Sequence, residues 1–351
     1  MSFFQDLRDL LTLERVSHVG PHQYEAHSGQ HDGHSTSGPV MWARTESSEL
    51  VNPDGNIFNA EENLIETRVR KELPAYIPEG VRVVELGPGT FTAFNKKTLL
   101  IIHALKSTTC TIVDKSHAFL KSIYDSKALL GIENLEQVED DFFQPSRCYH
   151  DNDDEALVTL LGSTLGNMLG PLRDKLPEAA LVNALQNVAN ATRKGWLLVS
   201  IDTDQNGERV QAYYKKQEEF QLNIFDRLIA AGLVDKRFKR EAIEYDTEWR
   251  SSSGQLGHMA VIKRKLKFAL AGMEVVLRKG QRLHLKNSFK FKPEFFEKCC
   301  NLAGLELVKV WSDDSTTQIW LLKKKPLSAQ LIVEQRPRYQ PQRELRTALA
   351  A

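Results

Sequence analysis

The sequence predicts an α/β fold built on a parallel sheet, because apolar strands alternate with amphipathic helical segments between Arg82 and Asp202. A Gly-x-Gly turn follows the first of these strands. Between strands, apolar residues such as Leu99, Ile102 and Leu105 recur at helical spacing. The runs interpreted as strands are Val83–Leu86, Thr109–Val113, Leu135–Val138, Ala156–Leu161 and Trp196–Ile201.

The turn after the first strand contains Gly87 and Gly89. Glycine lacks a Cβ atom, so the backbone of such a turn can approach a nucleotide-like ligand closely. The third glycine of the dinucleotide fingerprint is replaced by Thr92, which disfavours NAD and FAD. Glu85 lies two residues before the first glycine, and this Glu-x-Gly-x-Gly pattern resembles that of class I S-adenosylmethionine methyltransferases. An ordinary tight turn between strand and helix is the alternative interpretation.

Acidic residues follow the next two strands of the predicted sheet. Asp114 ends the second strand, where a carboxylate can accept two hydrogen bonds from a ribose diol. Asp141 and Phe142 follow the third, where a carboxylate can accept a bond from an adenine amino group and an aromatic ring can lie on the base. Each acid alone could be a solvated loop residue, but three strand ends with suitable chemistry favour a nucleoside site.

Length and composition restrict the function classes. At 351 residues the chain exceeds the usual single core, so one α/β domain plus a second unit is expected. Lys plus Arg and Asp plus Glu both number 46, so no net charge attracts nucleic acid or an anionic membrane, and a small neutral or zwitterionic substrate fits better. The four cysteines show neither metal nor disulfide spacing and are expected to be reduced thiols of a cytoplasmic protein. No apolar run approaches a membrane span, and no signal peptide is expected.

The pattern changes after Asp202, where an inserted segment is expected up to about residue 290. One long helix is predicted from Glu208 to Ala231, followed by short antiparallel strands that include Met259–Lys263 and Met273–Leu277. A helix from Pro293 to about Gly304 and a closing strand pair, Leu305–Val310 and Ile319–Leu322, are predicted to return to the first sheet.

A longer motif makes a family resemblance specific. The run Gly162-Ser163-Thr164-Leu165-Gly166-Asn167 resembles the Gly-Ser-Thr-Ile-Gly-Asn signature of the histidine Nα-methyltransferases of ergothioneine biosynthesis. Relatives in that family, including fungal dimethylallyltryptophan N-methyltransferases, methylate other amino acids. The resemblance extends from Thr67 to Leu322, and its further matches are Lys97-Thr98, Asp141-Phe142, Ala212-Tyr213, Leu222-Asn223, Ser288-Phe289-Lys290-Phe291 and Trp311-Ser312-Asp313.

The resemblance implies a class I S-adenosylmethionine methyltransferase (Rossmann-like) fold with a second α+β substrate domain. It assigns residues 66–204 and 291–326 to the methyltransferase domain, 1–65 and 205–290 to the substrate-binding domain, and 327–351 to a C-terminal tail. S-adenosyl-L-methionine is the implied cofactor, and Asn167 is expected to position the substrate for catalysis. The cofactor-binding residues are then Glu85, Gly87, Gly89, Lys97, Asp114, Asp141, Phe142, Gly162 and Ser163, and the substrate-binding residues are Asn167, Tyr213, Lys286 and Ser288.

Two departures from the family pattern concern the substrate. Lys286 stands where the histidine enzymes carry a Glu that binds the substrate amine, and Leu64-Ile65 stands where they carry paired tyrosines. Replacing a carboxylate by an ammonium reverses the local charge, so a protonated α-amine would be repelled and histidine is an unfavourable substrate. A carboxylate attracted by Lys286 is the expected occupant. The alternative is that Lys286 points to solvent.

The favoured function is an S-adenosylmethionine-dependent N-methyltransferase of secondary metabolism that acts on an amino acid or amino-acid-derived small molecule other than histidine. One alternative is an O- or carboxyl-methyltransferase of a small metabolite, and another is a noncatalytic homologue that binds the cofactor. The sequence does not identify a general base, although His258 and His284 could face the pocket. It predicts no oligomeric state.

A histidine-rich segment lies outside the family pattern. His18, His22, His27, His31 and His34 fall within 17 residues, so a metal site is one interpretation of this segment. The glycines and Pro21 disfavour the helix that would place these histidines on one face, and no carboxylate or cysteine cluster accompanies them. No metal site is expected, and a polar loop, with a substrate-capping role as one possibility, is favoured.

Overall fold

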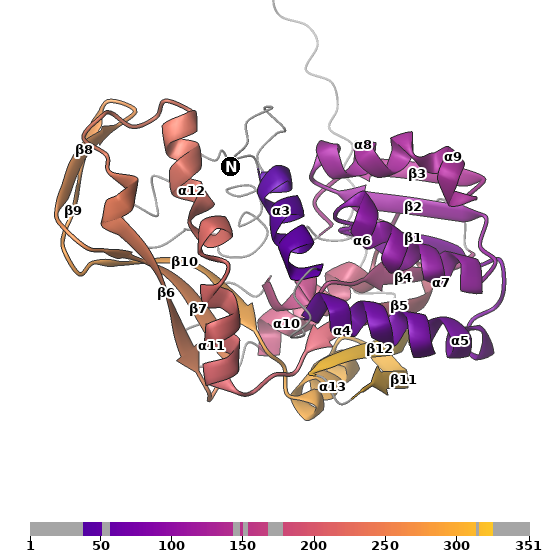
Figure 1. The fold of residues 1–351 in the computed structure, drawn as a ribbon. Helices are drawn as coiled ribbons and strands as arrows, with labels where there is room; N and C mark the ends of the chain where they lie inside the picture. Colours follow the sequence, from indigo (N-terminus) through magenta and orange to yellow (C-terminus); the bar gives the residue numbers. More distant parts are fainter. Residues whose placement is uncertain are drawn as a thin grey trace, which may run out of the picture.

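The computed structural model describes residues 38–50, 57–142, 148–149, 154–167, 178–313 and 316–325. These residues form two lobes (Figure 1). One lobe is built on a seven-stranded sheet, and the other on a three-stranded sheet beside a two-stranded hairpin. Helix α3 (Gly38–Leu50) lies between the lobes in this view.

The seven-stranded sheet confirms the predicted α/β fold. Its order is β11-β12-β5-β4-β1-β2-β3, with the five strands from β5 to β3 parallel and with β12 antiparallel to both of its neighbours. The strands are β1 (Arg82–Leu86), β2 (Thr109–Asp114), β3 (Asn134–Glu139), β4 (Glu155–Leu160), β5 (Lys194–Asp202), β11 (Leu305–Ser312) and β12 (Thr317–Lys324). Because parallel strands present their carboxyl ends at one edge, the loops after β1, β2 and β4 lie together.

Helices cover both faces of this sheet, as expected when parallel strands are apolar on both sides. One face packs against α10 (Glu178–Ala189) and α13 (Pro293–Leu302). The other face packs against two groups of helical segments. The first group is α4 (Ile57–Leu64), η1 (Ile65–Val69), α5 (Arg70–Glu72) and η2 (Leu73–Ala75), and the second is α6 (Phe91–Lys96), α7 (Thr98–Ala104), α8 (His117–Asp125) and α9 (Lys127–Leu130).

The second lobe has its own hydrophobic core. Its sheet has the order β10-β7-β6, and α12 packs on this sheet together with the β8-β9 hairpin. Phe225, Phe268 and Leu283 from these three parts are fully buried in the shared core. The elements are α11 (Gly207–Lys215), α12 (Glu218–Ala230), η4 (Arg240–Ala242), β6 (Ile243–Arg250), β7 (Gln255–Ile262), β8 (Leu266–Leu270), β9 (Met273–Leu277) and β10 (Arg282–Phe289).

In the described residues from β5 onward, the chain passes between the lobes twice, at adjacent places. It leaves the seven-stranded sheet after Asp202, at the end of β5, and returns through Lys290 and Phe291. The Phe291 amide donates a hydrogen bond to the Asp202 carbonyl (2.8 Å), and the Lys290 amide donates one to the Gly254 carbonyl (2.7 Å). The first bond ties the outgoing and returning segments together, and the second holds the returning segment to the turn between β6 and β7.

One predicted helix is wrong in extent. The segment Glu208–Ala231 forms two helices, α11 and α12, that separate at Lys216 and Gln217. The segment Lys215–Glu219 is entirely polar, so no apolar stripe holds a continuous helix against the core. The break lets α11 pack on β6 while α12 reaches α3.

Other boundaries agree closely with the sequence analysis. The predicted strand Met273–Leu277 is β9, and the helix predicted from Pro293 is α13. Leu64 and Ile65 pack in the core of the seven-stranded sheet, so this part of the segment 1–65 lies with the first lobe. The histidine-rich segment and the expected tail lie outside the described residues.

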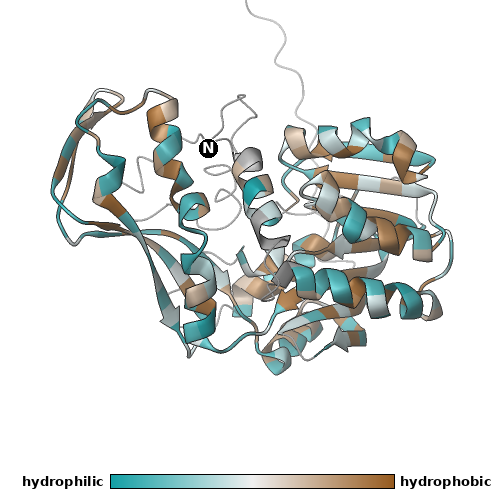
Figure 2. Cartoon of the chain, in the orientation of Figure 1, coloured by the Kyte–Doolittle hydropathy of each residue, from teal (hydrophilic) through white to brown (hydrophobic). Residues whose placement is uncertain are grey.

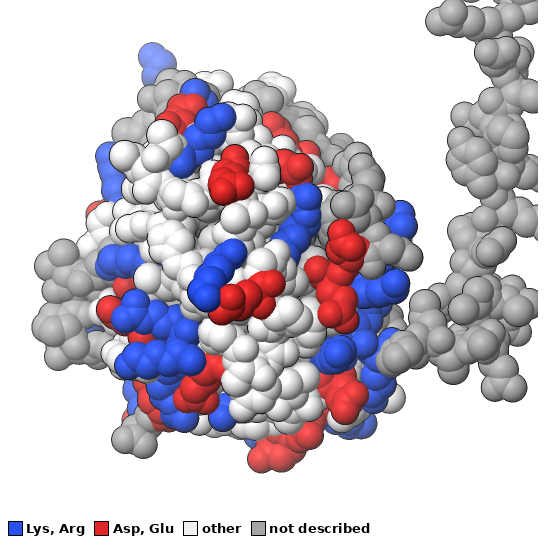
Figure 3. Space-filling view, turned by 90° about the vertical axis from the view of Figure 1, so that its right-hand side faces the viewer, with Lys and Arg blue, Asp and Glu red and all other residues white. Residues whose placement is uncertain are grey.

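Polarity follows the layers. Figure 2 shows hydrophobic residues concentrated in the strands of the large sheet and hydrophilic ones on the helices that cover it. Figure 3 shows acidic and basic side chains interspersed on one face of the molecule, without a large area of one sign. In the described part of the chain, no helix combines the length and the apolar character needed to cross a membrane.

We expect Phe296→Ala to lower the free energy of unfolding by about 3–5 kcal/mol, because the ring is fully buried and leaves a cavity. Phe296 lies on α13 with its ring centroid 5.1 Å from Trp320 and 5.6 Å from Phe291. Urea denaturation of both proteins measures the loss. The matched control is Leu302→Ala on the same helix, where the side chain is 53% exposed and little change is expected. Equal losses in the two variants would contradict the assigned core.

Candidate active site

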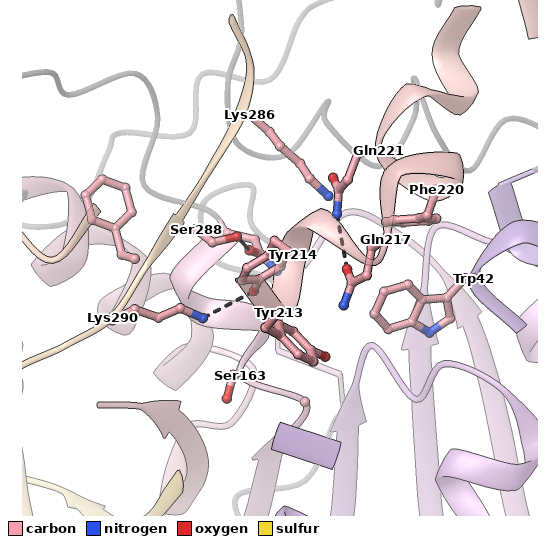
Figure 4. A pocket seen from close by; sticks show the side chains of 13 residues that line it. Trp42, Ser163, Tyr213, Tyr214, Gln217, Phe220, Gln221, Lys286, Ser288 and Lys290 are labelled. Atoms are coloured by element: carbon pink, nitrogen blue, oxygen red, sulfur yellow. Dashed lines mark hydrogen bonds between the residues drawn. The ribbon is translucent and has the colours of Figure 1, made fainter. Parts of the chain in front are cut away.

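A pocket opens between the two lobes, at the carboxyl end of β4. Its empty space, including the solvent-open mouth, is about 580 Å³. Figure 4 shows side chains from α3, α11, α12 and β10 directed toward it. The described residues that line it are Trp42, Gly162, Ser163, Asn167, Tyr213, Tyr214, Gln217, Phe220, Gln221, Lys286, Ser288, Phe289 and Lys290.

The loop after β4 has an unusual backbone. Gly162 and Ser163 both have positive φ angles, of 74° and 52°. A positive φ is uncommon for a residue with a Cβ atom and often marks a functional site. The Ser163 amide donates to Ser200 Oγ (3.0 Å), whereas Ser163 Oγ is buried without a hydrogen-bond partner in the described structure. This hydroxyl is available to a ligand.

A buried ion pair supports the same loop from behind. Glu61 on α4 accepts a hydrogen bond from Lys97 Nζ (3.0 Å) and, through its other oxygen, one from the Gly162 amide (2.7 Å). Glu61 is fully buried and Lys97 is 6% exposed. The nearby carboxylate of Glu61 raises the pKa of Lys97 although burial opposes this shift. Lys97, predicted to bind cofactor, therefore holds the loop through Glu61.

A chain of hydrogen bonds connects the two lobes beneath the pocket. Ser288 Oγ on β10 donates to Asn167 Oδ1 (2.9 Å), which lies at the end of η3 (Thr164–Asn167). His258 Nε2 lies 3.0 Å from Ser288 Oγ, and His258 Nδ1 lies 2.6 Å from the hydroxyl of Tyr245. Burial raises the pKa of Tyr245, so its hydroxyl stays protonated and donates to His258 Nδ1. His258 then carries its proton on Nε2 and donates to Ser288.

This chain of bonds requires close contact between η3 and β10. A Cβ atom added at Gly166 would lie 2.5 Å from the carbonyl oxygen of Phe289. Real Cβ atoms do not approach a backbone oxygen so closely, so glycine is needed here. The contact brings Asn167 to Ser288.

Aromatic rings form the walls of the pocket. The rings of Trp42 and Phe220 lie 5.3 Å apart, and Tyr213 and Tyr214 meet edge to face at 5.0 Å. Tyr213 was predicted from the sequence as a substrate-binding residue, and the structure places it at the pocket. Aromatic pairs of this kind bury a large apolar area and suit a flat ligand.

Two lysines of β10 and its exit also face the pocket. Lys290 pairs with the carboxylate of Asp202 and donates to the Tyr214 hydroxyl (3.2 Å), and the Asp202 charge raises its pKa although burial opposes the shift. Lys286 is 6% exposed, and its ammonium lies 4.8 Å from the centre of the Phe220 ring. Lys286 therefore faces the pocket, and the alternative that it points to solvent is wrong.

The other predicted cofactor residues lie around the glycine turn after β1. Gly87 and Gly89 have positive φ angles of 70° and 67°. A Cβ atom at Gly87 would lie 3.3 Å from the Phe142 ring, which therefore packs directly against the turn. Thr90 ends the turn and caps α6 by accepting a bond from the Ala93 amide (3.1 Å). The backbone is thus held open for a closely approaching ligand.

Three carboxylates predicted for this site have different surroundings. Asp114 accepts a bond from the Ser116 amide (2.7 Å), and burial raises its pKa to about 7. Asp141 pairs with Lys115 (2.8 Å). Glu85 is 2% exposed and receives a bond from Thr159, and burial raises its pKa to about 8. These three carboxylates are not among the described residues that line the pocket, and the same holds for the other predicted cofactor residues Gly87, Gly89, Lys97 and Phe142.

Comparisons with known proteins decide the family. The family model of histidine-specific, S-adenosylmethionine-dependent methyltransferases matches residues 56–324. The chain belongs to this family. It is also 36% identical over 304 residues to the uncharacterized protein y4iF of Sinorhizobium fredii, covering 82% of this chain and 99% of that protein. It is 22% identical to the N-methyltransferase imqF of Aspergillus flavus, covering 76% of this chain and 74% of that protein.

The chain is also similar to the solved structure of the CcbJ methyltransferase from Streptomyces caelestis, with 14% sequence identity and a TM-score of 0.40. The match covers 80% of this chain and 96% of that chain. The sugar N-methyltransferase KedS8 from Streptoalloteichus has 12% identity, a TM-score of 0.42, and coverage of 81% and 93%. With the family established, this chain is a methyltransferase that uses S-adenosylmethionine and has the class I Rossmann-like fold.

The residues around the glycine turn fit this cofactor. The turn offers close backbone approach, Asp114 offers a carboxylate at the end of β2, and Ser163 offers an unpartnered hydroxyl. When bound, S-adenosylmethionine supplies an electrophilic methyl group. We expect Asp114 to accept bonds from the ribose diol and Ser163 to contact the cofactor where the pocket begins.

Several pocket residues were missed by sequence analysis. Trp42, Tyr214, Phe220 and Gln221 line the pocket, and Glu61 holds its loop. None belongs to a motif with a chemical signature, and contacts such as Trp42 with Phe220 join positions far apart in the chain. His284, weighed from the sequence, bonds to Asn287 Oδ1 (2.8 Å). Among the described residues, no group of three or more His, Cys, Asp or Glu could hold a metal ion.

We expect Asp114→Asn to weaken binding of S-adenosylmethionine by about 1–3 kcal/mol, because a charged acceptor is lost. Burial raises the Asp114 pKa to about 7, and only the ionised form accepts both ribose bonds. Affinity of the unmodified protein should therefore fall as pH falls through 7, by up to about tenfold per unit. Calorimetry across this range measures both effects. The control is Asp125→Asn on the exposed side of α8. An unchanged affinity in Asp114→Asn would remove this residue from the site.

We expect Gly166→Ala to destabilise the protein by roughly 1–3 kcal/mol, because the new methyl group meets the Phe289 carbonyl oxygen and pushes η3 from β10. Denaturant unfolding measures this. Gly257→Ala is the matched control, since its Cβ atom would have no neighbour nearer than 3.7 Å. Similar stability in both variants would show that η3 and β10 adjust without cost.

Proposed function

We propose that this methyltransferase transfers a methyl group to nitrogen in an amino acid or an amino-acid-derived small molecule other than histidine. The observation that carries the proposal is the hydrogen bond between Asn167 and Ser288 at the pocket. Asn167 ends the loop that begins at the cofactor side, and Ser288 belongs to the second lobe. The family match and the fungal relative named as an N-methyltransferase support nitrogen as the acceptor atom.

We propose that the described part of the second lobe, residues 205–290, provides the acceptor side of the pocket and that the seven-stranded sheet provides the cofactor side. Methyl transfer is an in-line displacement, so the protein must align acceptor and methyl group and exclude water. Asn167 would position the acceptor, and Tyr213 would contact it from α11. The bonds from Tyr245 through His258 and Ser288 fix the orientation of the Asn167 amide.

Histidine is disfavoured by the charge of the pocket. Among the described residues that line it, none is Asp or Glu, so a protonated α-amine would find no opposite charge there. Lys286 would repel the α-amine when charged.

Methylation of oxygen or of a carboxylate is the second candidate. It is favoured by the same lysine, because a cation in the pocket attracts an acidic acceptor and would hold it beside Asn167 and Ser288.

Incubation with methyl-labelled S-adenosylmethionine and a pool of amino acids and their derivatives tests the proposal. We expect a labelled product whose fragmentation in mass spectrometry places the methyl on nitrogen, and no product from L-histidine. Reactions containing excess S-adenosylhomocysteine serve as the control, since the product of the cofactor competes for its site. A methyl group located on oxygen would favour the second candidate, and steady conversion of L-histidine would contradict the charge argument.

A further inference from the structure

Lys286 has a position that the family resemblance does not explain. Lys286, Ser288 and Lys290 lie at alternate positions at the end of β10 and beyond, and all three line the pocket. The charge of Lys290 is balanced by Asp202. Lys286 makes no ion pair with any described residue, and burial alone lowers its pKa to about 7. Figure 4 shows its side chain extended into the pocket toward Gln221.

The described residues that line the pocket with Lys286 come from α3, the loop after β4, α11, α12, and β10 with its exit. Among them the other charged side chain is Lys290, which is paired with Asp202. From α3, α11 and α12 come the aromatic rings and the amides of Gln217 and Gln221. His258 on β7 is its cross-strand neighbour and bonds to Ser288. The titratable side chains that line the pocket are Tyr213, Tyr214, Lys286 and Lys290, and His258 lies beside Lys286 on the neighbouring strand. A buried cation without an anion is unfavourable, and the pocket supplies none from its described residues.

Another polar atom of the pocket is placed to accept a hydrogen bond from a donor group of a ligand. The side-chain oxygen of Gln221 is buried without a hydrogen-bond partner in the described structure, while its amide nitrogen bonds to Gln217 (3.2 Å). Next to these groups stand the rings of Trp42 and Phe220. The pocket thus combines a positive, polar end with flat apolar walls.

We propose that the acceptor of this enzyme is a planar aromatic molecule with a carboxylate, and that this carboxylate forms the ion pair that Lys286 lacks. The inference rests on the proposed function and narrows its substrate class. The aromatic part lies between the rings of the pocket, and the carboxylate lies at Lys286. Lys286 is therefore a specificity-determining residue, because it selects an anionic acceptor over a neutral or cationic one.

Binding of matched probes tests this pairing without knowledge of the natural substrate. Indole-3-acetate and 4-hydroxyphenylacetate are compared with their carboxamides by calorimetry, in the presence of S-adenosylhomocysteine. We expect at least one carboxylate to bind about tenfold or more tightly than its amide. Lys286→Met should abolish this preference, and Lys286→Arg should retain it because the charge remains. Lys265→Met, at an exposed lysine of the second lobe, is the control and should leave it unchanged.

The pH dependence gives an independent measurement. Free Lys286 loses its proton as pH rises through about 7, whereas a bound carboxylate stabilises the protonated form. The affinity for a carboxylate should therefore fall above pH 7. Binding should also be accompanied by proton uptake at Lys286, so the measured heat of binding should depend on the ionisation enthalpy of the buffer. Affinity for S-adenosylhomocysteine in Lys286→Met shows that this variant is folded.

The inference is overturned if no carboxylate binds more tightly than its amide, if Lys286→Met keeps the preference, or if affinity rises with pH. An affinity that rises with pH would instead indicate that the ligand binds to neutral Lys286, with the lysine nitrogen accepting a proton from the ligand. Failure of the proposed function would give a different result, namely a methyl group located on oxygen in the labelling experiment. That result would not affect the preference for a carboxylate that the binding experiment measures.

Discussion

The buried ion pair between Asp202 and Lys290 fixes the place where the chain leaves the seven-stranded sheet and later returns to it. Both side chains are 3% exposed, so loss of either partner would leave a charge in a dry environment. Lys290 also bonds to the Tyr214 hydroxyl, which connects the crossing to α11. The orientation of β10, and with it the face that carries Lys286 and Ser288, follows from this crossing.

The two halves of the site are held in place by different sets of hydrogen bonds. On the cofactor side, Glu61 holds the loop after β4 through Gly162 and Lys97, which is a contact between distant parts of one lobe. On the acceptor side, Tyr245 and His258 hold Ser288 from within the second sheet. The two supports meet where Asn167 bonds to Ser288. Such fully bonded buried networks give a site one fixed geometry.

Predictions from the sequence succeeded where one short segment carried the chemistry. The strand and glycine turn around Gly87, and the signature from Gly162 to Asn167, led to the fold and to the cofactor. Predictions were weaker for positions whose neighbours come from elsewhere in the chain. Glu85 matched a motif, but its hydrogen bond from Thr159 on the neighbouring strand β4 could not be predicted from that motif. The long helix was wrong in extent because the polar segment Lys215–Glu219 interrupts its apolar face, and the two halves pack on different elements, α11 on β6 and α12 on α3.

By itself the sequence determined the alternation of strands and helices, the glycine turn and the presence of a lysine at position 286. These are properties of local hydrophobic period and backbone freedom, which neighbouring residues dictate. Only the tertiary structure decided that Lys286 is buried among aromatic rings from α3 and α12, and that no described side chain there balances its charge. Burial and charge compensation depend on side chains that lie between positions 42 and 290 in the sequence and meet only in the folded protein. The distances between these side chains cannot be obtained from the linear sequence.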